Sequence, residues 1–160
     1  VHNAYSMALK DELCAVLATV YANPQIECVR LSGNGPSFCA GGDLSEFGQV
    51  TDAASAHHSR VTRSAGALLA RLPCRSEAHL HGACIGAGIE VPAFADHVSA
   101  RKDSYFQLPE IAMGLVPGAG GTVSISARIG RQRTNWLAIS NQRLDAPTAL
   151  AWQLIDAIDG

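Results

Sequence analysis

The chain has 160 residues, the size of one domain, and could bury roughly two thirds of the surface that its unfolded form exposes. With 48% hydrophobic residues, 16% charged residues and a formal charge of -2, it has the composition of an apolar globular protein and lacks the strongly basic character of nucleic-acid-binding domains. The longest apolar stretch, residues 83–95, is too short to span a membrane and contains Glu90.

The five cysteines, at positions 14, 28, 39, 74 and 84, form no Cys-x-x-Cys pair and no cysteine–histidine cluster of the kind that binds zinc. This pattern is typical of reduced thiols. The N-terminal residues lack the charged and apolar regions of a signal peptide. We therefore expect a cytoplasmic protein with no metal site, no nucleic-acid partner and no membrane association.

The first half of the chain alternates helix and strand patterns. Residues 6–24 end at an Asn-Pro pair and place five apolar side chains at helical spacing, which predicts an amphipathic helix: Leu9, Leu13, Val16, Leu17 and Val20. The next segments have the patterns of a strand, a helix and a short strand, at residues 26–33, 52–74 and 77–82.

The second half begins with a glycine-rich segment, residues 83–90, which we expect to open a further helix. A strand at residues 96–102 leads into a second glycine-rich segment. Three helical patterns then complete the chain, at residues 122–130, 133–140 and 146–158. Because helices and strands alternate without a linker or a repeat, we predict a single α/β domain over residues 1–160.

The glycine-rich segments match none of the common nucleotide-binding or nucleophile motifs. The sequence contains no Walker A loop, no complete G-x-G-x-x-G after a strand and no G-x-S-x-G. Cys39 and Cys84 lie in these segments, where small buried packing is the commoner role of a cysteine. Phosphate binding of these types and a serine nucleophile are therefore not indicated.

A helix that begins near Ala87 would direct its unsatisfied N–H groups toward whatever lies before it, and a polarised carbonyl oxygen suits that position. Glu90 follows about one turn later in an apolar setting, where an unpaired carboxylate tends to have a raised pKa. Glu110 follows Pro109 in another turn, and the two carboxyls could hold one water between them. Alternatively, both are acidic residues of first helical turns, which stabilise a helix without any catalytic role.

Four segments in order resemble the enoyl-CoA hydratase/isomerase, or crotonase, family: "SGNGPSFCAGGDLSEF", "HGACIGAGIE", "LPEIAMGLVPGAGGT" and "LDAPTALAWQLID". The resemblance covers nearly the whole chain and includes the spacing between the segments. It implies a ClpP/crotonase-like fold of repeated ββα units. Members of this family also have N-terminal strands and a C-terminal helical region, which this sequence lacks, so the resemblance implies an incomplete chain.

By this resemblance, the backbone N–H groups of Gly42 and Ala87 bind the thioester oxygen of an acyl-CoA in an oxyanion hole. Four residues match the stretch that lies along the coenzyme A: Ala40, Asp43, Leu44 and Ser45. Glu90 would hold and activate the water that adds at the β-carbon, Glu110 would exchange the proton at the α-carbon, and Gly118 would help to place the water. Pro92 departs from the pattern, since it removes a backbone donor just after Glu90.

The resemblance implies an enoyl-CoA hydratase that adds water to the α,β double bond of an acyl-CoA thioester in fatty acid or related metabolism. It implies no metal or redox cofactor, coenzyme A being part of the substrate, and a homotrimer or a hexamer built as a dimer of trimers for the full-length protein. An isomerase or a hydrolase on the same scaffold, or an inactive acyl-CoA-binding subunit, are the alternatives.

Histidines and a basic cluster offer further candidates, but the chemistry of the family that the chain resembles does not use the histidines. We expect the histidines at surface or strand positions: His57, His58, His79 and His81. The basic cluster of Arg128, Arg131 and Arg133 could meet the phosphates of coenzyme A, or it could be the solvated face of a helix.

Overall fold

The computed structural model describes residues 2–46 and 64–160, which form an α/β structure, as predicted. The α-helices are α1 (Met7–Ala22), α3 (Ala65–Leu69), α4 (Ala87–Glu90), α5 (Gly121–Ser140) and α6 (Ala146–Trp152). Three 3₁₀ helices are η1 (Leu44–Glu46), η2 (Pro92–Phe94) and η3 (Ile111–Met113). The strands are β1 (Cys28–Ser32), β2 (Arg75–Leu80), β3 (Ala83–Ile85), β4 (His97–Arg101), β5 (Tyr105–Gln107), β6 (Leu144–Asp145) and β7 (Ala157–Asp159).

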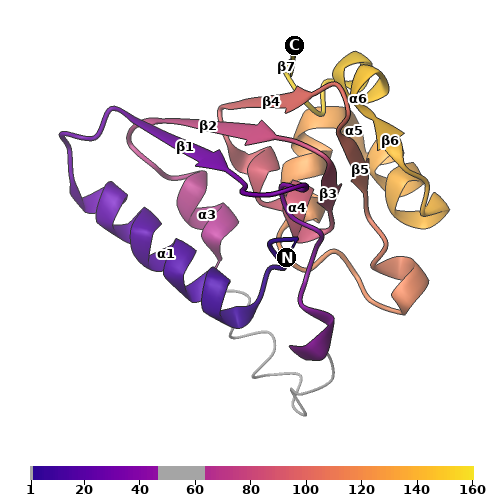
Figure 1. Cartoon of the computed structure of the whole chain (residues 1–160), viewed down its shortest axis with the longest axis horizontal. Helices are drawn as coiled ribbons and strands as arrows, with labels where there is room; N and C mark the ends of the chain where they lie inside the picture. Colours follow the sequence, from indigo (N-terminus) through magenta and orange to yellow (C-terminus); the bar gives the residue numbers. More distant parts are fainter. Residues whose placement is uncertain (1, 47–63) are drawn as a thin grey trace.

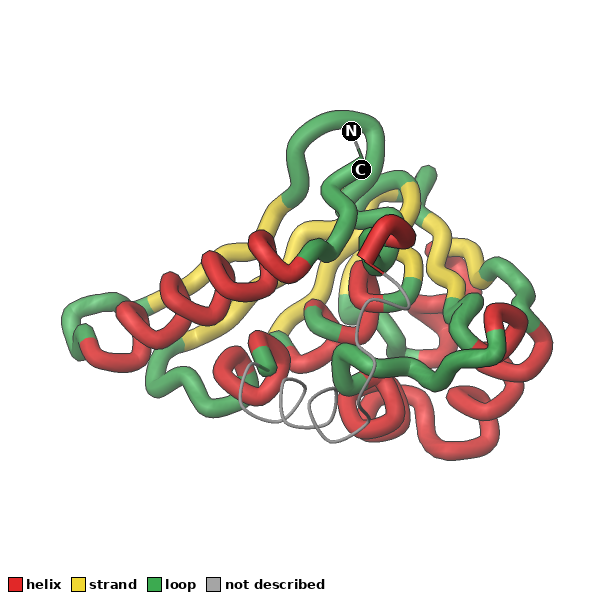
Figure 2. Tube along the Cα trace, turned by 90° about the horizontal axis from the view of Figure 1, so that it is seen from below, coloured by secondary structure: helices red, strands yellow, loops and turns green. Residues whose placement is uncertain are grey.

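The larger sheet has four parallel strands in the order β1-β2-β4-β7. Alternate residues of the two central strands are fully buried, among them Ala78, Leu80, Val98 and Ala100. In Figures 1 and 2, α1 lies alongside β1, and Figure 1 shows α5 and α6 near the β4–β7 side. The predicted helix α1 is confirmed, but of its apolar stripe only Leu17 and Val20 are buried, with the others at least partly exposed.

The smaller sheet, β3-β5-β6, carries the glycine-rich turns. Its β3 edge continues through a parallel bridge between Cys39 and Cys84, and a further bridge joins Tyr5 to Gly42. The sequence predicted no strand at β3 or β5, because three residues are too few to show an alternating pattern. These bridges place the segment of residues 39–42 against the turn that follows β3.

The helices of the C-terminal part differ from the prediction in two places. The patterns at 122–130 and 133–140 form α5, which is interrupted at Gly130 (φ 78°, ψ 161°). The helix expected over 146–158 is wrong beyond Trp152, because Gln153 adopts a left-handed conformation (φ 68°) that ends α6, and residues 157–159 join the larger sheet as β7. Trp152 packs edge-on against Trp136 of α5, with ring centroids 5.5 Å apart.

The helix expected over residues 52–74 falls partly outside the described residues. Its described portion contains α3, whose N-terminus is capped by Ser64: the hydroxyl oxygen accepts the Ala67 N–H at 3.1 Å. His57 and His58 also lie outside the described residues. In the described residues, no helix combines the length and the apolar character that crossing a membrane requires.

Candidate active site

The glycine-rich turns and the two candidate glutamates meet at one place. A Cβ atom at Gly86 would lie 3.9 Å from the Cα of Gly41 and would overlap with Oε1 of Glu110. A Cβ atom at Gly121 would lie 2.7 Å from Cγ of Glu90. Since the sequence separates these residues by up to 80 positions, the fold assembles the site from the turn before η1, the turn before α4, the start of η3 and the start of α5.

Glu90 is the last residue of α4 and is 1% exposed. Its Oε2 accepts the N–H of Ala119 at 2.9 Å and the N–H of Gly121 at 2.8 Å, both at the N-terminus of α5. Its backbone carbonyl accepts the hydroxyl of Ser124 at 2.7 Å. The amides at the start of a helix favour a negative charge, so α5 both orients this carboxyl group and stabilises its charged form.

Pro92 explains why α4 is so short. It begins the 3₁₀ helix η2 directly after α4, because a proline ring has no N–H with which to continue an α-helix. The lack of a backbone donor at Pro92 thus ends the helix, and Glu90 is the last residue of α4, beside the start of α5. The amides at the start of α5 set the orientation of its carboxyl group.

Glu110 is held less tightly than Glu90. It lies at the start of η3 as the capping residue and is partly buried, with its carboxyl group beside Gly86. Its Oε2 is buried and has no hydrogen-bond partner among the described residues. A buried carboxyl oxygen without a partner costs free energy, so this atom is available to a water or a ligand in the site.

The pKa of Glu90 is raised to about 7: burial is the main cause, the Gly121 and Ala119 amides oppose the rise, and the nearby Glu110 carboxyl adds to it. Burial also raises the pKa of Glu110, opposed by hydrogen bonds to its own backbone and to Glu90. Two carboxyls in contact cannot both ionise without strong repulsion. The pair therefore retains a shared proton at higher pH than an exposed glutamate would, and one carboxyl can act as an acid while the other acts as a base.

The two predicted oxyanion donors lie on the turns next to these carboxyls. Ala87 is the first residue of α4, and neither its N–H nor that of Gly42 donates to any residue in the described parts of the chain. The Gly41 carbonyl accepts the Tyr5 N–H at 2.7 Å, so this peptide is anchored on one side. Both N–H groups are therefore available to a substrate oxygen.

The residues matched to the coenzyme A stretch lie on either side of Gly42: Ala40 is exposed before it, and Asp43, Leu44 and Ser45 follow it. Asp43 accepts the N–H and the hydroxyl of Ser45 at 3.0 and 2.7 Å, which holds the pKa of this carboxyl below its usual range. Leu44 is 67% exposed, and the N–H of Ala40 donates to the carbonyl of His2. Gly118 is exposed beside Ala119, whose N–H binds Glu90. Contacts of these residues with coenzyme A stay a prediction.

Sequence reasoning missed the residues that hold Glu90, namely Ala119, Gly121 and Ser124. The "PGAGG" run just before a helix was the available signal, because the amides of such a turn can bind a carboxylate. His79 lies in β2, and the ring of His81 contacts the carbonyl of Gly35 at 3.0 Å, away from the glutamate pair.

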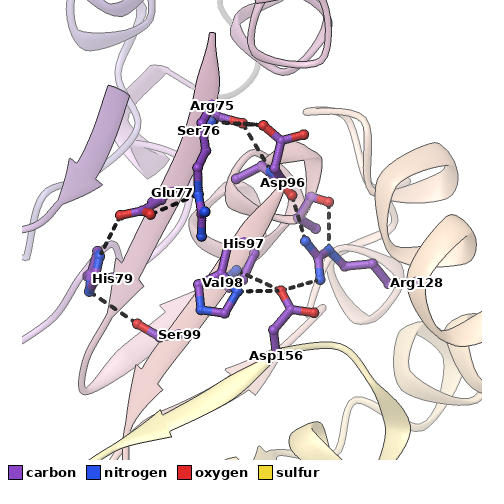
Figure 3. Close-up of polar contacts among 12 residues, drawn as sticks. Arg75, Ser76, Glu77, His79, Asp96, His97, Val98, Ser99, Arg128 and Asp156 are labelled. Atoms are coloured by element: carbon purple, nitrogen blue, oxygen red, sulfur yellow. Dashed lines mark hydrogen bonds and ion pairs between the residues drawn. The ribbon is translucent and has the colours of Figure 1, made fainter. Parts of the chain in front are cut away.

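The basic cluster does not form one open surface. Figure 3 shows Arg128 directed toward Asp156 and the turn before β4. Its guanidinium donates to the carbonyls of Ala93 and Ala95 at 2.9 and 2.6 Å and to Asp156 at 3.1 Å, and its side chain is only 14% exposed. Asp156 also accepts the N–H of Val98, which ties the chain before β7 to β4. The interpretation of Arg128 as a phosphate-binding residue or a solvated arginine is wrong, because its donors are used within the fold.

Comparisons with known proteins identify the family of this chain. The family model described as "Enoyl-CoA hydratase/isomerase" matches residues 1–160. A mevalonyl-coenzyme A hydratase of Beauveria bassiana is 32% identical over 98% of this chain, which covers 59% of that relative. A 2,3-dehydroadipyl-CoA hydratase of Escherichia coli is 31% identical over 92% of this chain, which covers 57% of that relative.

Solved structures show the same fold. DspI of Pseudomonas aeruginosa superposes with a TM-score of 0.91 at 28% identity, over 99% of this chain and 61% of that chain. An enoyl-CoA hydratase of Bacillus anthracis gives 0.86 at 28% identity, over 98% of this chain and 62% of that chain. The predicted crotonase fold is confirmed, and this chain spans about three fifths of the length of these proteins.

Proposed function

The chain belongs to the enoyl-CoA hydratase/isomerase family, and we propose that within this family it acts as an enoyl-CoA hydratase that adds water reversibly across the α,β double bond of an acyl-CoA thioester. One observation carries this proposal: the buried carboxyl of Glu90 and the partly buried carboxyl of Glu110 lie beside two turns in which the N–H groups of Gly42 and Ala87 have no partner among the described residues. Because the chain covers 59% of a hydratase-named relative, the activity of the whole protein is part of this proposal.

In the proposed reaction, a water lies between the two carboxyls and the β-carbon of the substrate. Glu90 in its charged form takes a proton from the water as the oxygen bonds to the β-carbon. Glu110 in its protonated form gives a proton to the α-carbon. The proton gained by Glu90 then returns to Glu110, so the pair carries the same single proton before and after each turnover.

Negative charge develops on the thioester oxygen while the water adds. The N–H groups of Gly42 and Ala87 are the proposed donors to this oxygen, and donors that are fixed in advance lower the barrier without reorganising. Gly118 is proposed to help place the water. The residues on either side of Gly42, namely Ala40, Asp43, Leu44 and Ser45, are the proposed contact with coenzyme A. The chemistry needs no metal or redox cofactor.

The partners and the location follow from the same proposal. We expect an acyl-CoA thioester as the substrate and a homotrimer, or a dimer of trimers, for the full-length protein. Nucleic acid and membrane have no part in the proposed reaction, and a cytoplasmic location stays a prediction from the cysteine pattern. The length and branching of the acyl chain are left to experiment.

Product identification tests the proposal most directly. The protein is incubated with a panel of enoyl-CoA thioesters in ¹⁸O-labelled water, and the products are separated and weighed by mass spectrometry. A 3-hydroxyacyl-CoA that carries one ¹⁸O atom is expected. A shifted alkene without added oxygen would indicate an isomerase, release of free coenzyme A would indicate a hydrolase, and binding without any product would indicate an inactive subunit; each of these outcomes overturns the hydratase proposal.

A further inference from the structure

We propose that residues 2–5 clamp the Gly41–Gly42 peptide in the orientation of an oxyanion donor, and that Asn3 is the positioning residue that holds this clamp. The inference rests on the proposed role of the Gly42 N–H. It concerns a segment whose residues do not touch the reacting atoms in the proposed mechanism.

The Gly41–Gly42 peptide needs an external restraint because glycine flanks it on both sides. Gly41 has a φ of 97°, in the left-handed region, and Gly42 also lacks a side chain to limit rotation. Rotation of this peptide by half a turn would present the Gly41 carbonyl to the substrate where the Gly42 N–H should be. A carbonyl oxygen would repel the developing oxyanion, so the rotated form would be inactive.

Tyr5 opposes this rotation directly. Its N–H donates to the Gly41 carbonyl at 2.7 Å. A trans peptide is planar, so its C=O and its N–H point in opposite directions. With the Gly41 carbonyl held toward Tyr5, the Gly42 N–H points away from Tyr5. Rotation would break this hydrogen bond, and a second bond, from the Ala40 N–H to the His2 carbonyl at 2.9 Å, holds the neighbouring residue in register.

Asn3 fastens this segment to the chain that leads into the turn. Its side-chain Nδ2 lies 2.8 Å from the carbonyl oxygen of Asn34 and 3.0 Å from those of Ser37 and Phe38. Three acceptors around one atom identify it as the amide nitrogen. Asn3 also has a φ of 50°, a conformation that asparagine tolerates better than most residues. One side chain therefore holds residues 2–5 beside residues 34–41.

Asn3→Asp tests the clamp with little change in shape. The carboxylate would set an oxygen against three carbonyl oxygens, so the segment should separate from the turn and the peptide should rotate. We expect kcat to fall by about ten- to hundredfold, which does not exceed the fall in kcat that follows the removal of one oxyanion donor. The KM should change by less than about threefold. Asn135→Asp makes the same chemical change at an exposed position of α5 and should leave both constants unchanged.

A spectroscopic measurement reports the donor without relying on turnover. The ¹³C resonance of the thioester carbonyl in bound [1-¹³C]butyryl-CoA, which has no double bond to hydrate, should be shifted from its free value by the wild-type protein. The shift should largely disappear in Asn3→Asp. If Asn3→Asp does not fold, Asn3→Ser removes the amide group that reaches the three carbonyls, without adding a charge, and is measured in the same way.

Gly42→Ala supplies a rescue that a general loss of stability would not show. Gly42 is not among the glycines with positive φ, and rotation of the peptide would move its φ into the positive region, which alanine disfavours. In the Gly42→Ala background, Asn3→Asp should therefore cost at least about threefold less in kcat than it costs in the wild type.

An unchanged carbonyl shift in the folded Asn3 variants, or an equal kcat loss in both backgrounds, overturns the clamp. The hydratase proposal fails separately: if the product is not a hydrated acyl-CoA but the carbonyl shift is present and depends on Asn3, the clamp stands and the assigned reaction does not. If wild-type protein binds butyryl-CoA without any carbonyl shift, the oxyanion role of Gly42 is wrong, and the clamp is overturned with it.

Discussion

Glu90 and Glu110 have the same side chain and share one site, but the fold holds them in different ways. Glu90 is 1% exposed, and its carboxyl and carbonyl oxygens accept three hydrogen bonds from the first turns of α5 and the loop before it. Glu110 is partly buried, and one of its carboxyl oxygens has no partner among the described residues. Fixed backbone amides of α5 therefore orient the Glu90 carboxyl, whereas the Glu110 carboxyl keeps one oxygen without a partner among the described residues.

This difference separates two ways of tuning an acid–base pair. Amides at a helix N-terminus stabilise the charged form, so they keep Glu90 usable as a base despite its burial. Glu110 lacks such a restraint on Oε2, so this atom can turn toward a water or an α-carbon. Substitutions near Glu90 should therefore act through α5, and substitutions near Glu110 through the turn at Gly86.

The largest effect should come from replacing either carboxyl. Glu90→Gln and Glu110→Gln remove proton transfer and keep the shape, so each should lower kcat by about a hundred- to ten-thousandfold in a steady-state hydration assay. The affinity for a saturated acyl-CoA should change little.

The double variant distinguishes a functional pair from two separate groups. If both carboxyls serve one step, the loss in the double variant should be far smaller than the product of the two single losses. Full multiplication of the two losses would contradict the proposed pair, and a nearly normal kcat in either single variant would remove that residue from the mechanism.

Alanine at the two glycines that touch the glutamates should have the next largest effect. A Cβ atom in Gly121→Ala would lie 2.7 Å from Cγ of Glu90, and one in Gly86→Ala would overlap with the Glu110 carboxyl. We expect each to lower kcat by about ten- to hundredfold, since a small displacement of a catalytic group has effects of this size. The rates are to be measured on protein whose circular dichroism shows that it is folded.

Gly130→Ala is the matched control for Gly86→Ala. Both glycines have positive φ, 78° and 52°, but a Cβ atom at Gly130 would meet nothing within 4 Å. It should lower stability by about 1 kcal/mol or somewhat more through backbone strain and leave kcat nearly unchanged. If Gly130→Ala and Gly86→Ala reduce kcat equally, backbone strain and not contact with Glu110 explains the effect.

The raised pKa of Glu90 predicts how stability depends on pH. The folded protein binds the proton more tightly than the unfolded chain, so it gains stability below the ordinary pKa of 4.5 and loses that gain as pH rises toward about 7. Urea titrations at several pH values should show the free energy of unfolding falling by about 1 to 3 kcal/mol across this window. Glu90→Gln should flatten the slope more than Glu110→Gln, because Glu90 is more deeply buried.

The smallest effect should come from Ser124, which touches the backbone of Glu90 and not its carboxyl group. Ser124→Ala removes the 2.7 Å bond to the Glu90 carbonyl and should lower stability by about 1 kcal/mol in a urea titration. The change in kcat should stay within about threefold, because both amides still bind the carboxyl. Ser126→Ala, in the same helix, is the control and should be neutral. If Ser124→Ala lowered kcat as much as Gly121→Ala does, the bond to the Glu90 carbonyl, and not the two amides, would set the orientation of the Glu90 carboxyl group.

Much of the fold could be predicted from the sequence because α1, β1 and β4 have patterns of their own: apolar spacing, alternation and an Asn-Pro stop. The strands β3 and β5 could not, because three residues carry no period and their pairing is tertiary. The end of α6 was missed because it depends on the left-handed conformation of Gln153. Glycine or asparagine usually occupies such a position, so a glutamine there does not indicate the end of a helix.

Of the candidate site, the sequence and the family resemblance identified the positions of both glutamates and the two glycine-rich turns. They did not identify the partners of Glu90, because Ala119 and Gly121 contribute backbone amides, and an amide is present at every residue except proline. Which amides reach a carboxyl depends on how α4 and α5 pack. The role of Asn3 could not be predicted for a related reason: the carbonyls that its side chain contacts lie more than 30 positions away in the sequence.

Trp136 and Trp152 are the chain's two tryptophans, and they pack against each other between α5 and α6. Indole emission therefore reports the docking of α6 on the second part of α5, beyond the interruption at Gly130. The proposed catalysis depends instead on the first turn of α5, which holds Glu90. Fluorescence and residual activity consequently sample opposite ends of the same element, and a denaturant titration that follows both signals would reveal whether the two halves of α5 unfold as one cooperative unit.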